Sequence, residues 1–270
     1  MNIWEELGRI NIELKKEFLC VPPYQCVNGK YLNDIKCDMA HGDSPAGKIR
    51  ASINLPWQRA YQIEYRYKKC EIFLPYMPVI EYATYDAMDG NWICSYLSFL
   101  PVVEAVLREW AKIRPDLSFN KMKGFVIQLV DFLKRQNYYP SDRKLWPESH
   151  VEFLQYALGI LYQDFDQYKQ QNFSQIFNRN LSLHKLEGVI NISEGLSNIT
   201  RILLVLDIIA ELYLMQDPVN YWNIIFYADP ESNGDFQLRW NLYVKHAMLA
   251  AGPNDLMVLY NHFIDKKTMT

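Results

Sequence analysis

The most apolar segment of the chain reads Leu196-Ser-Asn-Ile-Thr-Arg-Ile-Leu-Leu-Val-Leu-Asp-Ile-Ile-Ala-Glu-Leu-Tyr-Leu-Met215. Every residue from Ile202 to Leu206 is apolar, so a helix formed here is buried on more than one side. We therefore expect this helix to form the centre of a helical bundle. The apolar part contains Asp207 and Glu211 and is shorter than the ~20 residues that span a bilayer, which predicts a soluble protein.

Helical periodicity continues on both sides of this segment. Apolar residues recur at spacings of three and four, which is typical of one face of a helix, and Pro115 ends the first of these runs. The strands required for a parallel sheet are missing, so the sequence predicts an all-α fold. The expected helices lie at 92–113, 122–136, 148–170, 172–186, 218–227, 236–249 and 255–266.

The N-terminal third has a weaker pattern. Residues 2–18 predict one amphipathic helix, with apolar side chains at positions 3, 7, 10, 14 and 18. From 21 to 91 the periodicity fades and prolines recur, so we expect irregular structure laid over the bundle, with short helix or strand at 57–67 and 71–74. These patterns divide the chain into an N-terminal helix plus irregular region (1–91), a helical bundle (92–216) and a C-terminal helical appendage (217–270).

The composition fits a folded protein without a strongly charged surface. Of the 270 residues, 50% are hydrophobic and 14% aromatic, which is far from the composition of disordered chains. The net charge of −3 gives no global indication of nucleic-acid binding, although it leaves room for a local basic patch. This length suits one large domain or two modest ones.

The cysteines and the N-terminus favour a cytoplasmic location. All five cysteines (Cys20, Cys26, Cys37, Cys70 and Cys94) precede residue 95 and none forms a CxxC pair. We expect buried, reduced thiols rather than a metal or redox site. The first residues lack the basic start and apolar run of a signal peptide.

Several common functional motifs are absent. The chain has no GxGxxG, GxxxxGK[ST], HExxH or GxSxG motif, which argues against Rossmann enzymes, P-loop NTPases, zincins and α/β-hydrolases. Asp207 and Glu211 lie one helical turn apart, but the Glu-x-x-His units of metal sites in bundles are missing. We expect this pair to neutralise Arg201 or a helix terminus. Residues 59–69 and 135–144 mix bases with tyrosines, as single-strand binders do, yet we interpret both as ordinary core and surface.

The run Arg179-Asn180-Leu-Ser-Leu-His184 contains the residue types needed for phosphodiester cleavage. A histidine titrates near neutral pH and exchanges protons with a ribose 2′-hydroxyl or a leaving oxygen. An arginine offers a permanently charged fork for phosphate oxygens, and an asparagine orients either group. With the 2′-hydroxyl as nucleophile, no metal is required. Five helical positions separate two side chains by roughly 140°, so the groups meet most easily at a helix N-terminus or bend.

The segment from Phe177 to Leu214 resembles the terminal helix pair of HEPN (higher eukaryote and prokaryote nucleotide-binding) proteins. Their signature is an arginine, a polar residue, a short spacer and a histidine, followed by a strongly apolar helix. Residues 100–110 also resemble an upstream helix of bacterial members, and the resemblance spans 92–216. Related sequences often have glycine directly after the histidine, whereas this chain has Lys185, with Gly188 three places later.

The resemblance implies a four- or five-helix bundle that dimerises, so that two Arg…His motifs form one composite cleft. Active members are metal-independent endoribonucleases, often in toxin–antitoxin or phage-defence systems. By this resemblance His184 is the general acid or base, Arg179 stabilises phosphate and transition state, and Asn180 orients them. Lys185 and Arg201 are the predicted substrate-binding cations. The implied partners are RNA or a nucleotide, a second copy of the chain and an antitoxin protein, with no cofactor or metal.

Two other interpretations remain open at this point. The bundle can be a non-catalytic binding or dimerisation module, or the motif can be coincidental in a helical scaffold, with Arg179 and His184 on a wet helix face paired to Glu187 or Glu194. Convergence of Arg179, Asn180 and His184 in one cleft separates the enzyme from both alternatives.

Overall fold

A computed structural model describes residues 3–26, 28–114, 116, 122–135, 145–171, 176–185, 187, 192–217, 229–230 and 232–250. Within these ranges the regular structure is helical and includes no strand, which confirms the all-α prediction. The α-helices are α1 (Ile3–Leu14), α2 (Gly29–His41), α3 (Ala46–Asn54), α4 (Pro56–Tyr65), α5 (Met77–Met88), α6 (Trp92–Ile113), α7 (Met122–Arg135), α8 (Leu145–Leu161), α9 (Phe165–Gln170), α10 (Arg179–Lys185), α11 (Ile192–Leu214) and α13 (Gly234–Ala250).

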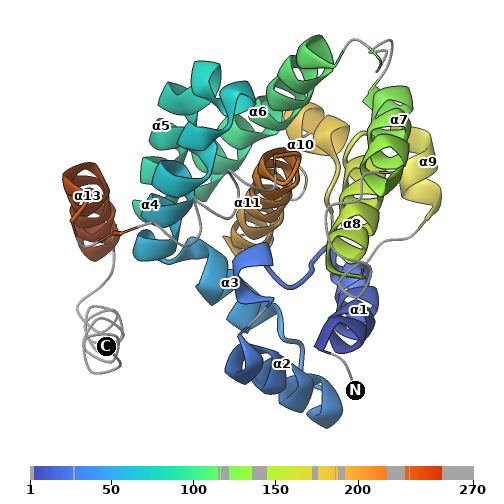
Figure 1. The fold of residues 1–270 in the computed structure, drawn as a ribbon, viewed down its shortest axis with the longest axis horizontal. Coiled ribbons are helices and arrows are strands. Elements are labelled where there is room, and N and C mark those ends of the chain that lie inside the picture. Colours follow the sequence, from blue (N-terminus) through green and yellow to red (C-terminus); the bar gives the residue numbers. More distant parts are fainter. Residues whose placement is uncertain are drawn as a thin grey trace.

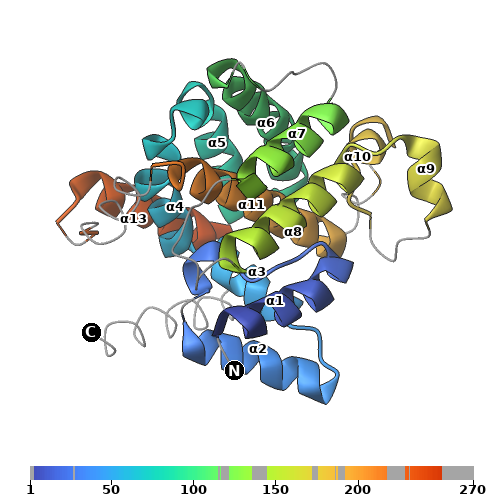
Figure 2. The ribbon, with the colours of Figure 1, turned by 45° about the vertical axis from the view of Figure 1, so that its right-hand side comes forward.

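Helix α11 forms the centre of the molecule. It lies between α6 on one side and α8 on the other, and it also contacts α3 (Figures 1 and 2). All residues from Arg201 to Leu212 are buried, as the apolar run predicted. No helix in the described ranges combines the length and the hydropathy that crossing a membrane requires.

Helix α1 follows its predicted pattern. Leu7, Ile10, Leu14 and Phe18 are all buried, and α1 packs against α8. Phe18 packs the N-terminal segment against the bundle, and its ring centroid lies 5.5 Å from the ring centroid of Phe177. The spacing of three and four therefore identified both the helix and its inner face.

The expectation of irregular structure over 21–91 is wrong except at 57–67 and 71–74, where helix or strand was expected and helical structure forms. This region contains α2, α3, α4 and α5, together with short 3₁₀ turns. Two of its prolines begin α-helices, since Pro56 and Pro78 lie in the first turns of α4 and α5, while Pro75 lies within a 3₁₀ helix. A proline is tolerated in the first turn because the N–H groups of that turn have no partner within the helix.

Buried charges also obscured the periodicity of this region. Arg59 of α4 donates to both carboxylate oxygens of Asp207 in α11, at 3.1 and 2.5 Å, and Tyr67 donates to the same carboxylate at 2.5 Å. Arg66 pairs with Glu211 at 2.7 Å. The two acids are therefore neutralised by the N-terminal region, and the prediction that Arg201 would do so is wrong.

The predicted helix at 148–170 is divided in two. Helix α8 ends at Leu161 and α9 begins at Phe165. The helix expected at 172–186 is shorter, since α10 begins at Arg179, and helix α13 closely matches the expected 236–249. The helices predicted at 218–227 and 255–266 lie outside the described residues. Contacts of α5 with α6 and of α4 with α13 cross the boundaries predicted at 91 and 217, and the three-part division stays a prediction.

The cysteines follow the prediction only in part. Cys20, Cys26 and Cys70 are buried, whereas Cys37 and Cys94 are exposed. Each exposed thiol lies on the outer side of a helix. In the portion of the chain that the structure describes, no three His, Cys, Asp or Glu side chains are grouped as a metal would require.

Candidate functional site

Asn178 fixes the start of α10. Its side chain is fully buried, and its Oδ1 accepts a hydrogen bond from the backbone N–H of Leu181 at 3.2 Å, which is the N-cap arrangement that asparagine favours. Its Nδ2 donates to the carbonyl oxygens of Ile160 and Gln163 at 3.1 and 3.0 Å. One amide therefore caps α10, binds the carbonyls at the end of α8 and explains why α8 stops there.

The two residues before Asn178 are held from other helices. Asn198 of α11 donates to the carbonyl oxygen of Ile176 at 2.8 Å, and the Tyr168 hydroxyl of α9 accepts from the N–H of Phe177 at 2.9 Å. The Phe177 ring is fully buried. Because α8, α9 and α11 all contribute, the backbone at Arg179 has a well-fixed position.

Arg179 points toward α6. Its Nη2 lies 3.6 Å from Oε2 of Glu104, and Glu104 also accepts two hydrogen bonds from Arg108, at 3.0 and 2.6 Å. The Nε of Arg179 is buried and has no hydrogen-bond partner among the described residues. This arginine therefore retains N–H donors that Glu104 does not use.

These groups line a pocket of about 540 Å³ between α6, the end of α8, α9 and α10. Glu104 and Arg108 come from α6, and Arg179 and Asn180 begin α10. The rest of the lining is Gly159 and Ile160 of α8, Met122 of α7, Gln167 of α9, and Tyr162, Gln163 and Asp164 between α8 and α9. The pocket therefore contains two carboxylates, those of Glu104 and Asp164, beside its two guanidinium groups. In Figures 1 and 2, α10 lies beside the end of α8 and near α6, which brings these distant parts of the sequence together.

The tyrosine of this pocket is chemically unusual. Burial raises the pKa of Tyr162, the Glu104 carboxylate raises it further, and Arg179 opposes the shift. Its hydroxyl is buried and, within the described ranges, has no hydrogen-bond partner; the same holds for Oε1 of Gln163. The sequence analysis missed Glu104, Tyr162, Gln163 and Asn178. Only Asn178 carried a signal, as an N-cap residue type directly before a helix.

His184 does not join Arg179 and Asn180. It is exposed in the last turn of α10 and is not among the described residues that line the pocket. The reason is helical geometry, because five positions turn the two side chains roughly 140° apart. The convergence that would favour a catalytic centre within one chain is therefore not present. Lys185 is exposed beside His184 and also lies outside the pocket lining.

Arg201 is buried and cannot bind a substrate at the surface. Its Nη1 donates to Oδ1 of Asn198 at 2.7 Å, and its Nε donates to the carbonyl oxygen of Glu17 at 3.0 Å. Burial lowers the pKa of Arg201 to about 10. Its prediction as a substrate-binding residue is wrong. Its structural role is to join α11 to the 3₁₀ turn after α1 through the carbonyl oxygen of Glu17, while Asn198 of the same helix holds the guanidinium.

No protein-family model, curated protein or solved structure matches this chain. The HEPN resemblance therefore stays a prediction, and the chemistry of the pocket has to be argued from its own residues. Two guanidinium groups and one amide offer N–H donors in a partly enclosed space, which is an arrangement suited to binding phosphate or carboxylate oxygens. Within the described lining there is no histidine to move a proton.

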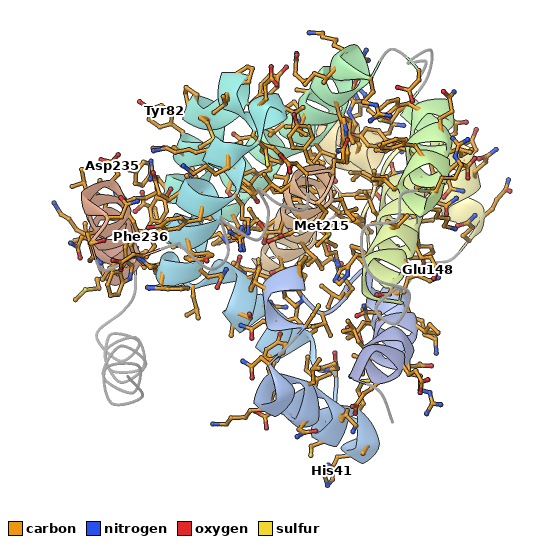
Figure 3. All side chains as sticks on the ribbon, in the orientation of Figure 1. His41, Tyr82, Glu148, Met215, Asp235 and Phe236 are labelled. Carbon is orange, nitrogen blue, oxygen red and sulfur yellow. The ribbon has the colours of Figure 1, made fainter. Side chains whose placement is uncertain are left out.

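Three other histidines lie elsewhere and have structural partners. His150 is buried, with Nε2 at 3.0 Å from the carbonyl oxygen of Val21 and at 3.7 Å from Sγ of Cys26. His246 contacts Asp89 at 2.7 Å. His41 lies at the end of α2, far from α10, and its Nδ1 bonds the carbonyl oxygen of Cys37 (Figure 3).

The two stretches that mix bases with tyrosines are ordinary parts of the fold or lie outside the described residues. The stretch at 59–69 is mostly buried in the core. Most of 135–144 lies outside the described residues.

Proposed function

We propose that this protein binds a phosphate-bearing ligand, a nucleotide or RNA, in the pocket between α6, α8 and α10. The observation that carries the proposal is the position of Arg179. Its backbone is fixed by buried asparagines, its side chain lines the pocket, and its Nε donor has no partner among the described residues. A buried donor of this kind is costly to leave unpaired, and a ligand oxygen satisfies it.

The surrounding groups support an anionic ligand of modest size. Arg108 provides a second guanidinium and Asn180 a side-chain amide on the same wall. Glu104 partly neutralises Arg108 and Arg179. The pocket therefore favours a ligand whose oxygens are acceptors strong enough to displace the Glu104 carboxylate from the two guanidinium groups. A volume of about 540 Å³ is within the range of pockets that hold small molecules.

A second candidate function is metal-independent RNA cleavage at a site shared by two copies. It is favoured by the exposure of His184 at the end of α10, which leaves the imidazole accessible to a second copy of the chain. In that arrangement Arg179 binds the phosphate and His184 of the partner subunit exchanges the proton. The toxin–antitoxin or phage-defence setting rests on the HEPN resemblance alone.

Binding is tested with the full chain and two probes, adenosine 5′-monophosphate by calorimetry and a labelled single-stranded RNA by fluorescence anisotropy. Arg179→Gln removes the charge and should weaken binding by about tenfold or more. The matched control is Arg135→Gln, because Arg135 is exposed at the end of α7 and outside the pocket. Equal affinity in the wild type and Arg179→Gln, or no binding of either probe, would reject the proposed pocket.

Cleavage is tested separately, with RNA in the presence of a chelator. If the shared site is correct, His184→Ala abolishes cleavage while phosphate binding at the Arg179 pocket persists. The control is His41→Ala, which changes another exposed histidine at the opposite end of the molecule. Binding without any cleavage by the wild type leaves the non-catalytic binding module as the correct function.

A further inference from the structure

Three polar atoms in the pocket wall are buried and lack hydrogen-bond partners among the described residues. They are Nε of Arg179, the hydroxyl of Tyr162 and Oε1 of Gln163. Buried polar atoms in folded proteins are nearly always hydrogen-bonded. Of the eighteen buried side-chain atoms without such a bond in the described residues, three belong to residues that line this one pocket. They differ in character: Arg179 only donates, Gln163 Oε1 only accepts, and the tyrosine hydroxyl does both.

The arrangement of these atoms fits a ligand that presents more than a phosphate. Tyr162 lines the same pocket as Glu104 and Arg179, the two charged residues with the largest electrostatic effect on its hydroxyl. Gln163 is the next residue along the chain and its backbone carbonyl is already used by Asn178. The ionised oxygens of a phosphate ester only accept hydrogen bonds, so they do not satisfy Oε1 of Gln163. A neighbouring hydroxyl group of the ligand can.

We infer that Tyr162 and Gln163 form a sugar-hydroxyl subsite beside the Arg179 phosphate position, so that the pocket takes a sugar phosphate such as the ribose phosphate of a nucleotide. The inference rests on the proposed function. In this arrangement a ligand hydroxyl donates to Oε1 of Gln163 and accepts from the Tyr162 hydroxyl, while phosphate oxygens accept from Arg179 and Arg108. Tyr162 and Gln163 then determine specificity, and the arginines supply most of the affinity.

The alternative is that water molecules satisfy the same atoms and that the pocket selects only for anionic charge. The two cases differ in which ligand binds more weakly when the Tyr162 hydroxyl is removed from the protein. If this hydroxyl contacts only the sugar, its removal leaves the affinity for inorganic phosphate unchanged and lowers the affinity for a sugar phosphate. If it only orders water or supports the fold, its removal changes the affinity for both ligands equally or for neither.

The experiment measures the affinity of the full chain for ribose 5-phosphate and for inorganic phosphate by calorimetry. Wild type should bind ribose 5-phosphate about tenfold or more tightly than inorganic phosphate. Tyr162→Phe and Gln163→Met should each reduce that preference to about twofold or less while the affinity for inorganic phosphate stays within twofold. The control is Tyr156→Phe, a half-buried tyrosine of α8 that stacks on Phe18 away from the pocket lining and should leave both affinities unchanged.

The outcomes separate the two proposals. If inorganic phosphate binds in an Arg179-dependent manner but neither variant alters the preference for ribose 5-phosphate, the sugar subsite is overturned and the phosphate pocket stands. If wild type binds neither probe, both proposals fail. Circular dichroism and the thermal midpoint of each variant show whether the fold is retained, and Gln163→Met serves as the second measurement where Tyr162→Phe is destabilised.

Discussion

The side-chain amide of Asn178 donates a 3.0 Å hydrogen bond to the carbonyl oxygen of Gln163, and so connects the start of α10 to the chain that leaves α8. The same amide group binds Ile160 and caps α10. Arg179 and Gln163, which both line the proposed pocket, are therefore each adjacent to this one buried side chain.

Replacing Asn178 with alanine should destabilise the protein and disorder the pocket together. The change removes the cap of α10 and the side-chain donor to the carbonyl oxygens of Ile160 and Gln163, of which that of Ile160 keeps the backbone N–H of Gln163. We therefore expect a loss of about 2–4 kcal/mol in the free energy of unfolding. Chemical denaturation measures it. Asn180→Ala is the matched control, because Asn180 lines the pocket but is only partly buried; it should reduce ligand affinity and leave stability nearly unchanged. Similar stability losses in the two variants would contradict this account.

Breaking the Arg59–Asp207 ion pair should be among the most damaging single changes. Arg59→Met leaves a fully buried carboxylate with only the Tyr67 hydroxyl, which predicts about 3–5 kcal/mol of lost stability. The double variant Arg59→Met/Asp207→Leu removes both charges and should recover a substantial part of that loss. Urea titrations of the single and double variants test this. A double variant no more stable than Arg59→Met would show that the charges do not dominate.

Neutralising Glu104 should strengthen anion binding. Its carboxylate lies 3.6 Å from Arg179 and accepts hydrogen bonds from Arg108, so it competes with a phosphate for both guanidinium groups. Because these side chains are partly solvated, Glu104→Gln should raise the affinity for inorganic phosphate by a modest amount, about two- to fivefold. Glu13→Gln, on the exposed face of α1, is the control. Weaker binding by Glu104→Gln would instead make Glu104 a residue that positions the arginines.

The five cysteines should separate into two classes with a thiol reagent. Cys37 and Cys94 are exposed and should react rapidly with Ellman's reagent at pH 8. Cys20, Cys26 and Cys70 are buried, and burial raises the pKa of Cys20 and Cys70, so fewer thiolates form at that pH. All five thiols should react after denaturation. A Cys37→Ser/Cys94→Ser variant that still shows rapid reaction in the native state would contradict the burial of the others.

Sequence patterns predicted the helices whose buried positions are mainly apolar. Helices α1, α6 and α11 were identified because burial on one face or all round leaves a regular apolar spacing, even where a few buried polar residues interrupt it. Helix α4 was predicted only as short helix or strand at 57–67, since its buried face contains Gln58, Arg59 and Gln62. A polar residue with a partner 148 positions away has the same appearance in the sequence as one on the surface. First-turn prolines added to the error, because a proline that starts a helix looks like one that ends it.

The site was predicted in part for a similar reason. Arg179 and Asn180 were identified from residue type, and both line the pocket. Glu104, Tyr162 and Gln163 come from other helices, and only the fold brings them to Arg179. The separation of His184 from Arg179 follows from helical geometry, but the sequence did not show that α10 would run unbroken from one residue to the other.

The Arg59–Asp207 pair also has a consequence for synthesis of the chain. The two residues are 148 positions apart, so at translation rates of about 5–20 residues per second the arginine leaves the ribosome on the order of ten seconds before its partner is made. During that interval Arg59 and Arg66 have no carboxylate of α11 to pair with. A fragment that begins at residue 92 would in turn lack the cations that Asp207 and Glu211 require.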